Sequence, residues 1–349
     1  MNMPDIKTTR KIQLTGGSTY IVSLPKEWVK YFNLKAGDEV DIRTDPQMRL
    51  VVSPKELKVR ETKAIPVVHC ERENPDMIVR DVIAFYMASA AGVEISSKCL
   101  TPEEREMVKN AIRGRLLGAE IVDESSDSIT IQFVVSHKDL GINTAINRAF
   151  VISSNMLKDD LRALKNRRPE EALDVKFRDN EVDRFYFYVV RLLSQGTETL
   201  EALKSDGYSV SQVVNVFSVI RSVERISDHA YRIAENVPSI VVGDFPEELV
   251  DWGYSVLELY SRAMNAFLSK RKSQASEVIA KASLVREEYW LKVVKSYAAL
   301  PKPEQIVPAL LISDSLNRIT RYSMDIAEAT IDALAKAELE RAQGGNSST

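Results

Sequence analysis

Two pairs of carboxylates, spaced four residues apart, are the side chains of this sequence best suited to chemistry. Asp179 and Asp183 form one pair, and Glu224 and Asp228 form the other. If both segments are helical, each pair lies on one helix face with its Cβ atoms about 5 to 6 Å apart. Carboxylate oxygens suit hard cations such as Mg²⁺, Mn²⁺ or iron, so the four acids predict a cation site. The sequence has no Glu-x-x-His spacing beside them, which argues against a di-iron oxidase.

The segment that carries the second pair occurs twice. Residues 224–235 align without a gap with residues 317–328, where Asn317 and Arg321 replace the two acids. The second copy keeps the helical pattern of the first but lacks its two acids. This indicates a two-fold repeated bundle with a cation site in the first copy only. Arg321 carries its own positive charge. We therefore expect it to close the second site with a salt bridge, and Glu287 is the candidate partner.

Nearby basic residues leave a second interpretation open. They are Arg184, Arg221, Arg225 and Arg232. Acid pairs beside arginines often form only a solvated helix face. His229 directly follows Asp228, but a lone histidine is more often an exposed or core residue than a ligand.

Composition favours several domains. The chain has 349 residues, too many for one compact core, and suits two or three domains. Its net charge is −3, but residues 1–65 hold twelve Lys or Arg and eight Asp or Glu, which leaves +4 there and −7 elsewhere. A basic N-terminal module on an acidic body predicts that a polyanion, if one binds, binds at the N-terminal end.

Cysteine content and hydropathy predict a cytoplasmic chain. Cys70 and Cys99 are too few for a disulfide framework, and we expect two small, buried, reduced thiols. His69 stands beside Cys70, but no second ligand pair at a useful spacing supports metal there. No apolar stretch approaches the roughly 18 to 20 residues that span a bilayer, and the polar start argues against a signal peptide.

The N-terminal segment predicts a small β-rich domain. Strands are expected over 10–14 and 19–24 around a glycine turn, and over 39–44 and 48–53 after a short helix that Pro25 opens. Four short strands bury too little apolar surface for a stable core, so we expect this module to dimerise.

This segment resembles the AbrB/SpoVT swapped-hairpin family over about 45 residues of the range 1–54. The strand, Leu24-Pro25, the helix and Gly37-Asp38 carry the resemblance. It implies an intertwined homodimer whose paired strands present basic side chains to DNA. The candidate DNA contacts are Arg10, Lys11, Lys26, Lys30 and Arg43. Interspersed acids dilute the charge, so a solvated face of a dimerisation unit is the alternative.

Residues 62–138 predict an α+β module, which follows a charged linker over 55–63. Strands are expected at 64–68, 93–96, 119–123 and 128–135, and helices at 75–90 and 101–117. Thr101, Pro102 and Glu104 form a well-marked helix start. The order of elements resembles a ferredoxin-like sandwich and contains no catalytic constellation.

Residues 140–342 predict an all-helical region. Six helical periods cover 145–164, 179–201, 209–235, 248–269, 273–297 and 303–339. They fit a three-plus-three order, with the first bundle over 140–238 and the second over 245–342. Residues 343–349 are expected to be a disordered tail.

The helical region resembles the PhoU family over about 200 residues. Tandem three-helix bundles, the two acid pairs and the string Ile-Ser-Asp-His-Ala-x-x-Ile-Ala-Glu at 226–235 carry the resemblance. It implies one acidic cluster per bundle that can hold iron or another divalent metal (Mn, Mg or Zn). By position, the ligands here are the four acids of the first bundle. The second bundle departs from the family pattern.

The sequence offers no catalytic machinery. It contains no G-x-x-x-x-G-K-S/T loop, no G-x-G-x-x-G and no nucleophile–base pair, so we expect a regulator and no enzyme. The two resemblances together imply a regulator of phosphate uptake with a DNA-binding dimer module and a metal-binding helical body. The alternative is an adaptor that dimerises without binding DNA and acts on a phosphate ABC transporter's ATPase or a signalling kinase. A metal-dependent hydrolase is the third alternative.

Overall fold

The computed structural model describes residues 8–44, 49–55, 65–70, 75–195, 197–241, 245, 247–297 and 303–345. The chain divides into two compact units, Met1–Ala64 and Ile65–Thr349, which are described separately. The predicted linker beyond Lys55, the turn at 45–47 and the last four residues of the predicted tail lie outside the described residues.

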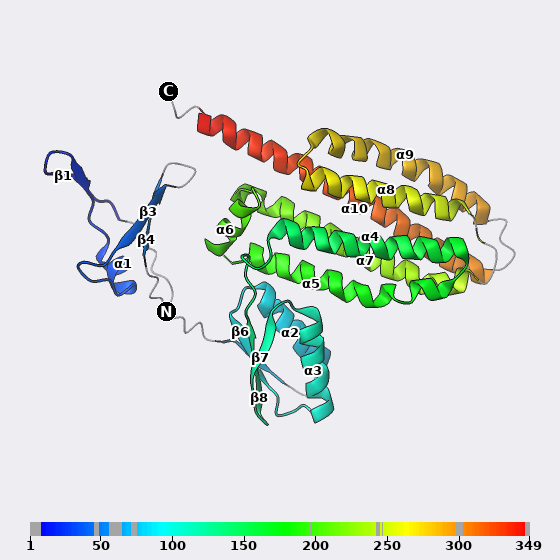
Figure 1. Ribbon diagram of the computed structural model, residues 1–349, viewed down its shortest axis with the longest axis horizontal. Coiled ribbons are helices and arrows are strands. Elements are labelled where there is room, and N and C mark those ends of the chain that lie inside the picture. Colours follow the sequence, from blue (N-terminus) through cyan, green and yellow to red (C-terminus); the bar gives the residue numbers. More distant parts are fainter. Residues whose placement is uncertain are drawn as a thin grey trace. The chain divides into compact units, whose positions relative to one another are not determined.

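The first unit contains two antiparallel hairpins and one short helix (Figure 1). Strand β1 (Gln13–Thr15) pairs with β2 (Thr19–Ile21), and β3 (Val40–Thr44) pairs with β4 (Leu50–Pro54). Between the hairpins lies α1 (Lys26–Tyr31), with Pro25 at its N-cap, one position earlier than predicted. Gly16 and Gly17 make the first turn with φ of 63° and 82°, values that favour glycine.

Hardly any side chain of this unit is buried. Among those whose burial is described, only Pro54 is buried. Five large apolar side chains are between 57% and 75% exposed: Ile12, Leu14, Tyr20, Ile42 and Leu50. One copy of the described unit therefore has no apolar core.

The second unit begins with a four-stranded mixed sheet and two helices that pack on it (Figure 1). The elements are β5 (Val67–His69), α2 (Pro75–Met87), β6 (Gly92–Ser96), α3 (Pro102–Arg115), β7 (Ala119–Glu124) and β8 (Ser128–Phe133). The strand order is β5-β6-β8-β7; β5 and β6 are parallel, and the other pairs are antiparallel. The predicted sheet and helices are confirmed, but the connectivity is β-α-β-α-β-β, whereas a ferredoxin-like sandwich runs β-α-β-β-α-β.

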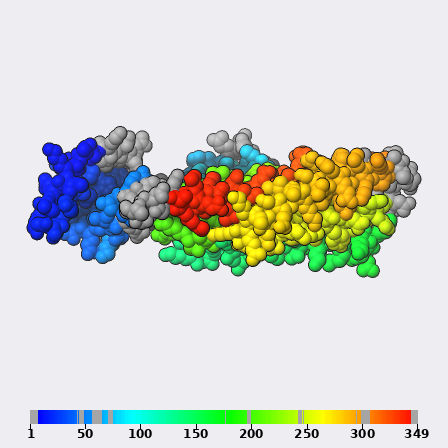
Figure 2. Space-filling model, turned by 90° about the horizontal axis from the view of Figure 1, so that it is seen from above, coloured from blue at the N-terminus to red at the C-terminus, as the bar shows by residue number. Residues whose placement is uncertain are grey.

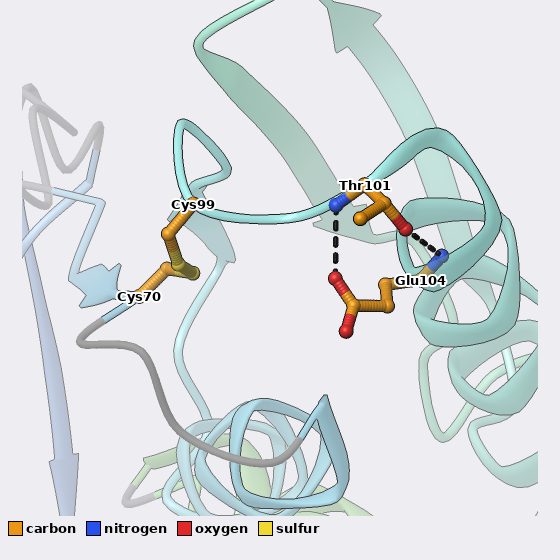
Figure 3. Close-up of a disulfide and its surroundings, with 4 residues drawn as sticks. All are labelled: Cys70, Cys99, Thr101 and Glu104. Atoms are coloured by element: carbon orange, nitrogen blue, oxygen red, sulfur yellow. Dashed lines mark hydrogen bonds between the residues drawn. A yellow bond between two sulfur atoms is a disulfide. The ribbon is translucent and has the colours of Figure 1, made fainter.

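The cysteines depart from expectation, because a disulfide joins Cys70 to Cys99 (Figure 3). Their Cα atoms are 6.0 Å apart; Cys70 is half-buried and Cys99 is exposed. Cys70 follows β5 and Cys99 lies three residues after β6, and these parallel strands end side by side. The prediction of two buried thiols is therefore wrong, since 29 residues of sequence separation hide the proximity that the sheet creates.

Helix α3 begins as predicted. Thr101 Oγ1 accepts a hydrogen bond from the Glu104 backbone N–H at 3.3 Å, and the Thr101 N–H donates to Glu104 Oε2 at 2.9 Å (Figure 3). This capping box satisfies two backbone donors that the first helical turn leaves unpaired.

The rest of the described part of this unit is dominated by six long helices. They are α4 (Ile142–Asn166), α5 (Val175–Leu193), α7 (Val213–Ile240), α8 (Glu248–Leu268), α9 (Lys272–Tyr297) and α10 (Pro303–Gly345). The helix predicted over 179–201 is two helices, because Ser194 caps the end of α5 and the short α6 (Thr197–Ser205) follows. Helix α10 runs to Gly345, into the predicted tail. Within the described ranges, no helix has the length and apolarity that a bilayer crossing requires.

The two three-helix bundles share one apolar core. Helix α4 packs with α5 and α7 in the first bundle, α8 packs with α9 and α10 in the second, α7 packs against α10, and α4 packs against α8. Figure 2 shows α9 (orange) at the surface beside α8 (yellow). The predicted three-plus-three arrangement is confirmed.

Helix α5 also contacts α2 and α3 of the sheet module. The buried Arg191 on α5 donates hydrogen bonds to the carbonyl oxygens of Tyr86 at 2.9 Å and Ala90 at 2.8 Å. Its guanidinium carbon lies 4.9 Å from the centroid of the Tyr86 ring. These contacts hold the sheet module against the bundle and bring the C-terminal end of α3 close to α5.

Candidate functional site

The structure brings the four predicted acids together. Asp179 and Asp183 lie on α5, Glu224 and Asp228 lie on α7, and these two helices pack against each other. All four side chains are half-buried or at the edge of exposure. We call these four residues the acidic cluster.

Two members of the acidic cluster titrate near neutrality. Burial, followed by the charges of the other three acids, raises the pKa of Asp183 to about 7. Burial also raises the pKa of Glu224 to about 7, with Asp228 the next contributor. Such mutual effects require that the carboxylates lie close together in a poorly solvated place.

The other two members are shifted in the same direction. Burial raises the pKa of Asp179, although a hydrogen bond from Ser227 lowers it. Burial raises the pKa of Asp228 as well and outweighs the opposing effect of two arginines. The cluster therefore resists carrying its full negative charge without a compensating cation.

Two of the four arginines named from the sequence lie at the cluster. Arg225 lies 3.3 Å from Asp228 Oδ2 and 3.6 Å from Glu224 Oε2, and Arg221 lies 3.9 Å from the same Glu224 oxygen. The other two are elsewhere, because Arg184 pairs with Glu181 and Arg232 pairs with Asp314 of α10.

Sequence reasoning missed one basic residue, Arg115. It belongs to the last turn of α3, and its charge lowers the pKa values of Asp179 and Asp183. Only the packing of α3 on α5 brings it there. His229 faces away from the cluster toward α10, with Nδ1 3.4 Å from Ser315 Oγ. Burial lowers the pKa of His229 to about 4, so it is neutral at pH 7.

The carboxylate oxygens of the acidic cluster are the ligand type that a hard cation prefers. Their positions do not yet surround a single point as the ligands of a bound ion would. No three His, Cys, Asp or Glu side chains of the described residues are arranged to hold one ion. Glu224 Oε2 is nevertheless buried and accepts no hydrogen bond from the described residues, among which only the two arginines lie within 4 Å of it as ion partners. A buried carboxylate oxygen without a donor, among acids of raised pKa, is suited to a cation.

The corresponding place in the second bundle is a cavity. Glu287, Asn317 and Arg321 line a hollow of about 560 Å³ between α9 and α10. Among the described residues, no ion pair within 4.0 Å joins Arg321 to Glu287. The expected salt bridge is therefore not formed, and the second site is open.

The predicted DNA contacts are on the surface of the first unit. Arg10, Lys11, Lys26 and Lys30 are all exposed, and the last two lie one turn apart on α1. Arg43 lies on β3, and its side chain is outside the described part of the structure.

Comparison with known families now identifies the two bundles. The family model described as "PhoU domain" matches residues 146–237 and residues 249–330. The chain carries two PhoU domains. The acidic cluster is in the first and the open cavity in the second. The model described as "Antidote-toxin recognition MazE, bacterial antitoxin" matches residues 13–59, so the first unit is a MazE/AbrB-like domain.

Two relatives are named phosphate-specific transport system accessory protein PhoU homologs. The protein from Rhizobium meliloti is 30% identical over 91 residues, and the one from Pseudomonas putida is 36% identical over 89 residues. Each alignment covers 26% of this chain, and the chain spans only 36% and 32% of the length of these relatives.

Two solved PhoU structures are similar at 17% sequence identity. PhoU from Pseudomonas aeruginosa has a TM-score of 0.47, with 56% of this chain and 96% of that chain covered. The phosphate transport system regulatory protein PhoU from Streptococcus pneumoniae has a TM-score of 0.48, with 54% and 91% covered.

Proposed function

We propose that this protein is a dimeric, DNA-binding regulator of phosphate transport. The observation that carries the proposal is the tandem PhoU match, together with relatives named as accessory proteins of phosphate-specific transport systems. In this proposal, the PhoU domains sense a metal ion or a partner, and the MazE/AbrB-like unit delivers the response to DNA.

The surface of the first unit supports both dimerisation and DNA binding. Its strands expose Leu14, Tyr20 and Ile42, which a second copy would cover to form a shared core. Its basic side chains Arg10, Lys11, Lys26 and Lys30 remain exposed and available to phosphate groups.

The DNA-binding step is tested by fluorescence anisotropy on duplex DNA over a salt series. If the four lysines and arginines contact phosphates, the logarithm of affinity should fall with the logarithm of salt concentration, with a slope of roughly −0.9 per contact. Replacing Arg10 and Lys11 with Ala should weaken binding and flatten that slope. The matched control, Arg262→Ala and Lys281→Ala on exposed sites of the second PhoU domain, should leave both unchanged.

A second candidate function follows from the same exposed apolar strands. Covering these strands requires only a dimer. The second candidate is therefore an adaptor that dimerises without binding DNA and contacts a phosphate transporter's ATPase or a signalling kinase. Absence of DNA binding at the lowest salt concentration, by a protein that is dimeric, would replace the first proposal with this one.

We also propose that the acidic cluster binds a divalent cation, with Asp179, Asp183, Glu224 and Asp228 as the residues that hold it. Bound there, the ion would supply positive charge to carboxylates that are costly to ionise together. Ser227 would keep Asp179 turned toward α7, and Arg225 would hold Asp228. Iron, Mn²⁺, Mg²⁺ and Zn²⁺ are the candidates.

Isothermal titration with Mn²⁺ tests this cation site without relying on regulatory activity. The wild-type protein should release protons as it binds Mn²⁺, because Asp183 and Glu224 must ionise. The Asp183→Asn/Glu224→Gln variant should lose the binding isotherm. Unchanged binding in that variant would remove the assignment, and Glu277→Gln at an exposed acid of α9 serves as the control.

A further inference from the structure

The cavity in the second PhoU domain lies where the duplicated helices place the counterpart of the acidic cluster. Arg286 and Trp290 lie four residues apart on α9, and Asn317 and Arg321 lie four residues apart on α10. Asn317 and Arg321 occupy the positions of Glu224 and Asp228. Between the same pair of helices, an asparagine and an arginine therefore stand where the first domain has Glu224 and Asp228, and Arg286 adds a second guanidinium group from α9.

The two arginines of this cavity form no close ion pair with the described residues, although the charge of Arg321 opposes the raised pKa of Asp325 on the same helix. In the part of the chain that the structure describes, Arg286 and Arg321 have no carboxylate within 4.0 Å. Arg318, by contrast, lies 3.8 Å from Asp314. Paired, exposed guanidinium groups are the usual partners of a phosphate, which they contact through parallel N–H donors.

The other residues that line the cavity are suited to an organic ligand that carries hydrogen-bond donors. Trp290 and Leu291 expose 41% and 60% of their surface, and the buried Trp252 lies edge-on to Trp290 with a centroid distance of 6.4 Å. Asn317 Oδ1 is buried and accepts no hydrogen bond from the described residues, and Glu287 is a second acceptor. An aromatic wall and two acceptors suit a flat ring with hydroxyl or amino groups.

The size of the cavity decides between inorganic phosphate and a larger molecule. Its volume of about 560 Å³ falls within the roughly 300 to 1,000 Å³ of sites for small organic ligands. We propose that this cavity binds a nucleoside monophosphate, with the phosphate on Arg286 and Arg321, the base against Trp290, and the ribose hydroxyls donating to Glu287 and Asn317.

The neighbouring surface fixes which end of the cavity takes the phosphate. Arg286 and Arg321 also line an adjoining hollow of about 380 Å³. That second hollow contains Asp325 and Glu328, which repel an anion, whereas the first contains only Glu287 among acids of the described lining. The phosphate therefore belongs on the side of the arginines that faces Asn317.

Isothermal titration of the full chain with the four nucleoside 5′-monophosphates, adenosine and inorganic phosphate tests the proposal. At least one nucleotide should bind saturably. Arg286→Ala and Arg321→Ala should each weaken it about 10- to 100-fold, the loss of a charge-assisted hydrogen-bond pair. Arg262→Ala, an exposed arginine of α8 that pairs with Glu258, should bind like wild type. Trp290→Ala should also weaken the nucleotide.

Several results would overturn the proposal. No saturable binding by any of the four nucleotides up to about 1 mM would do so. Equal affinity for adenosine would remove the role of the arginines, and equal affinity for inorganic phosphate would remove the organic ligand. Binding that both arginine variants retain, while their urea unfolding transitions match wild type, would place the ligand elsewhere.

Discussion

The Ser227 hydroxyl on α7 lies 2.9 Å from Asp179 Oδ1 on α5. Ser227 is fully buried, and its oxygen also lies 2.9 Å from the Glu224 carbonyl oxygen, so its proton is donated to one acceptor at a time. A buried hydroxyl at this point fixes the register of the two helices that carry the acid pairs. The acidic cluster therefore borders the packed interface of α5 and α7, and Asp179 is bonded across that interface.

The raised pKa values of Asp183 and Glu224 predict that the metal-free protein loses stability as pH rises. Between the ordinary carboxyl range and about pH 7, the native state binds more protons than the unfolded chain, so the free energy of unfolding falls as pH rises. The stabilisation that these two protonated acids give the native state is fully present at low pH and is lost above about pH 7. His229, with its lowered pKa, acts in the opposite direction, so a comparison with a variant is needed.

Urea unfolding of wild type and Asp183→Asn/Glu224→Gln at about pH 5 and about pH 8 measures this loss of stability. The variant should gain stability relative to wild type as pH rises, because neutral amides have no charge to desolvate. Saturating Mn²⁺ should stabilise wild type and leave the variant unchanged, which opposes this gain. A stability difference that does not change with pH would contradict the assigned burial of these acids.

Arg191→Ala should be among the most destabilising changes of an arginine in this chain. It removes a buried guanidinium that donates to the Tyr86 and Ala90 carbonyl oxygens and leaves both without that donor. We expect a loss of about 3 kcal/mol in the free energy of unfolding, measured by urea denaturation with tryptophan fluorescence. Arg262→Ala, which breaks only an exposed pair, should cost less than about 1 kcal/mol. Similar small losses for both would show that Arg191 does not join the module to the bundle.

Leu14→Glu combined with Leu50→Glu should convert the proposed dimer to a monomer. Both side chains are more than half exposed in one copy. A second copy would have to bury the two introduced carboxylates, which is costly. Light scattering after size-exclusion chromatography gives the mass directly. Val151→Glu, at an exposed apolar position of α4, should remain dimeric. A wild-type monomer, or a dimer that survives the double substitution, would refute dimerisation through the first unit.

Cys70→Ser/Cys99→Ser should destabilise the sheet module. The disulfide closes a segment of 29 residues, for which the chain-entropy model gives about 3 to 4 kcal/mol. Dithiothreitol should lower the unfolding midpoint of wild type to that of the variant and leave the variant unchanged. If the reductant has no effect on wild type, the disulfide does not contribute to stability.

The sequence predicts elements well where local rules act. The Thr101 capping box, the glycine turn at Gly16 and five of the six long helical periods depend on residues close together in the chain, and the structure contains them. The expectation that the two acid pairs converge is confirmed, because the consecutive bundle helices α5 and α7 pack side by side.

Features that depend on long-range packing are not visible in the sequence. Arg115 reaches the acidic cluster only because α3 packs on α5, and Cys70 reaches Cys99 only through the parallel pairing of β5 and β6. The break after Leu193 was missed because apolar periodicity continues across it into α6. Arg321 was expected to pair with Glu287, but helix packing leaves a cavity between their helices.

Chromatin immunoprecipitation of the protein from its own cells, in phosphate-rich and phosphate-limited media, tests the proposed regulator most directly. We predict enrichment at promoters of phosphate-transport genes that depends on phosphate supply and is lost when Arg10, Lys11, Lys26 and Lys30 are replaced with Ala. The result that would contradict it is an intact dimer that enriches no promoter in either medium.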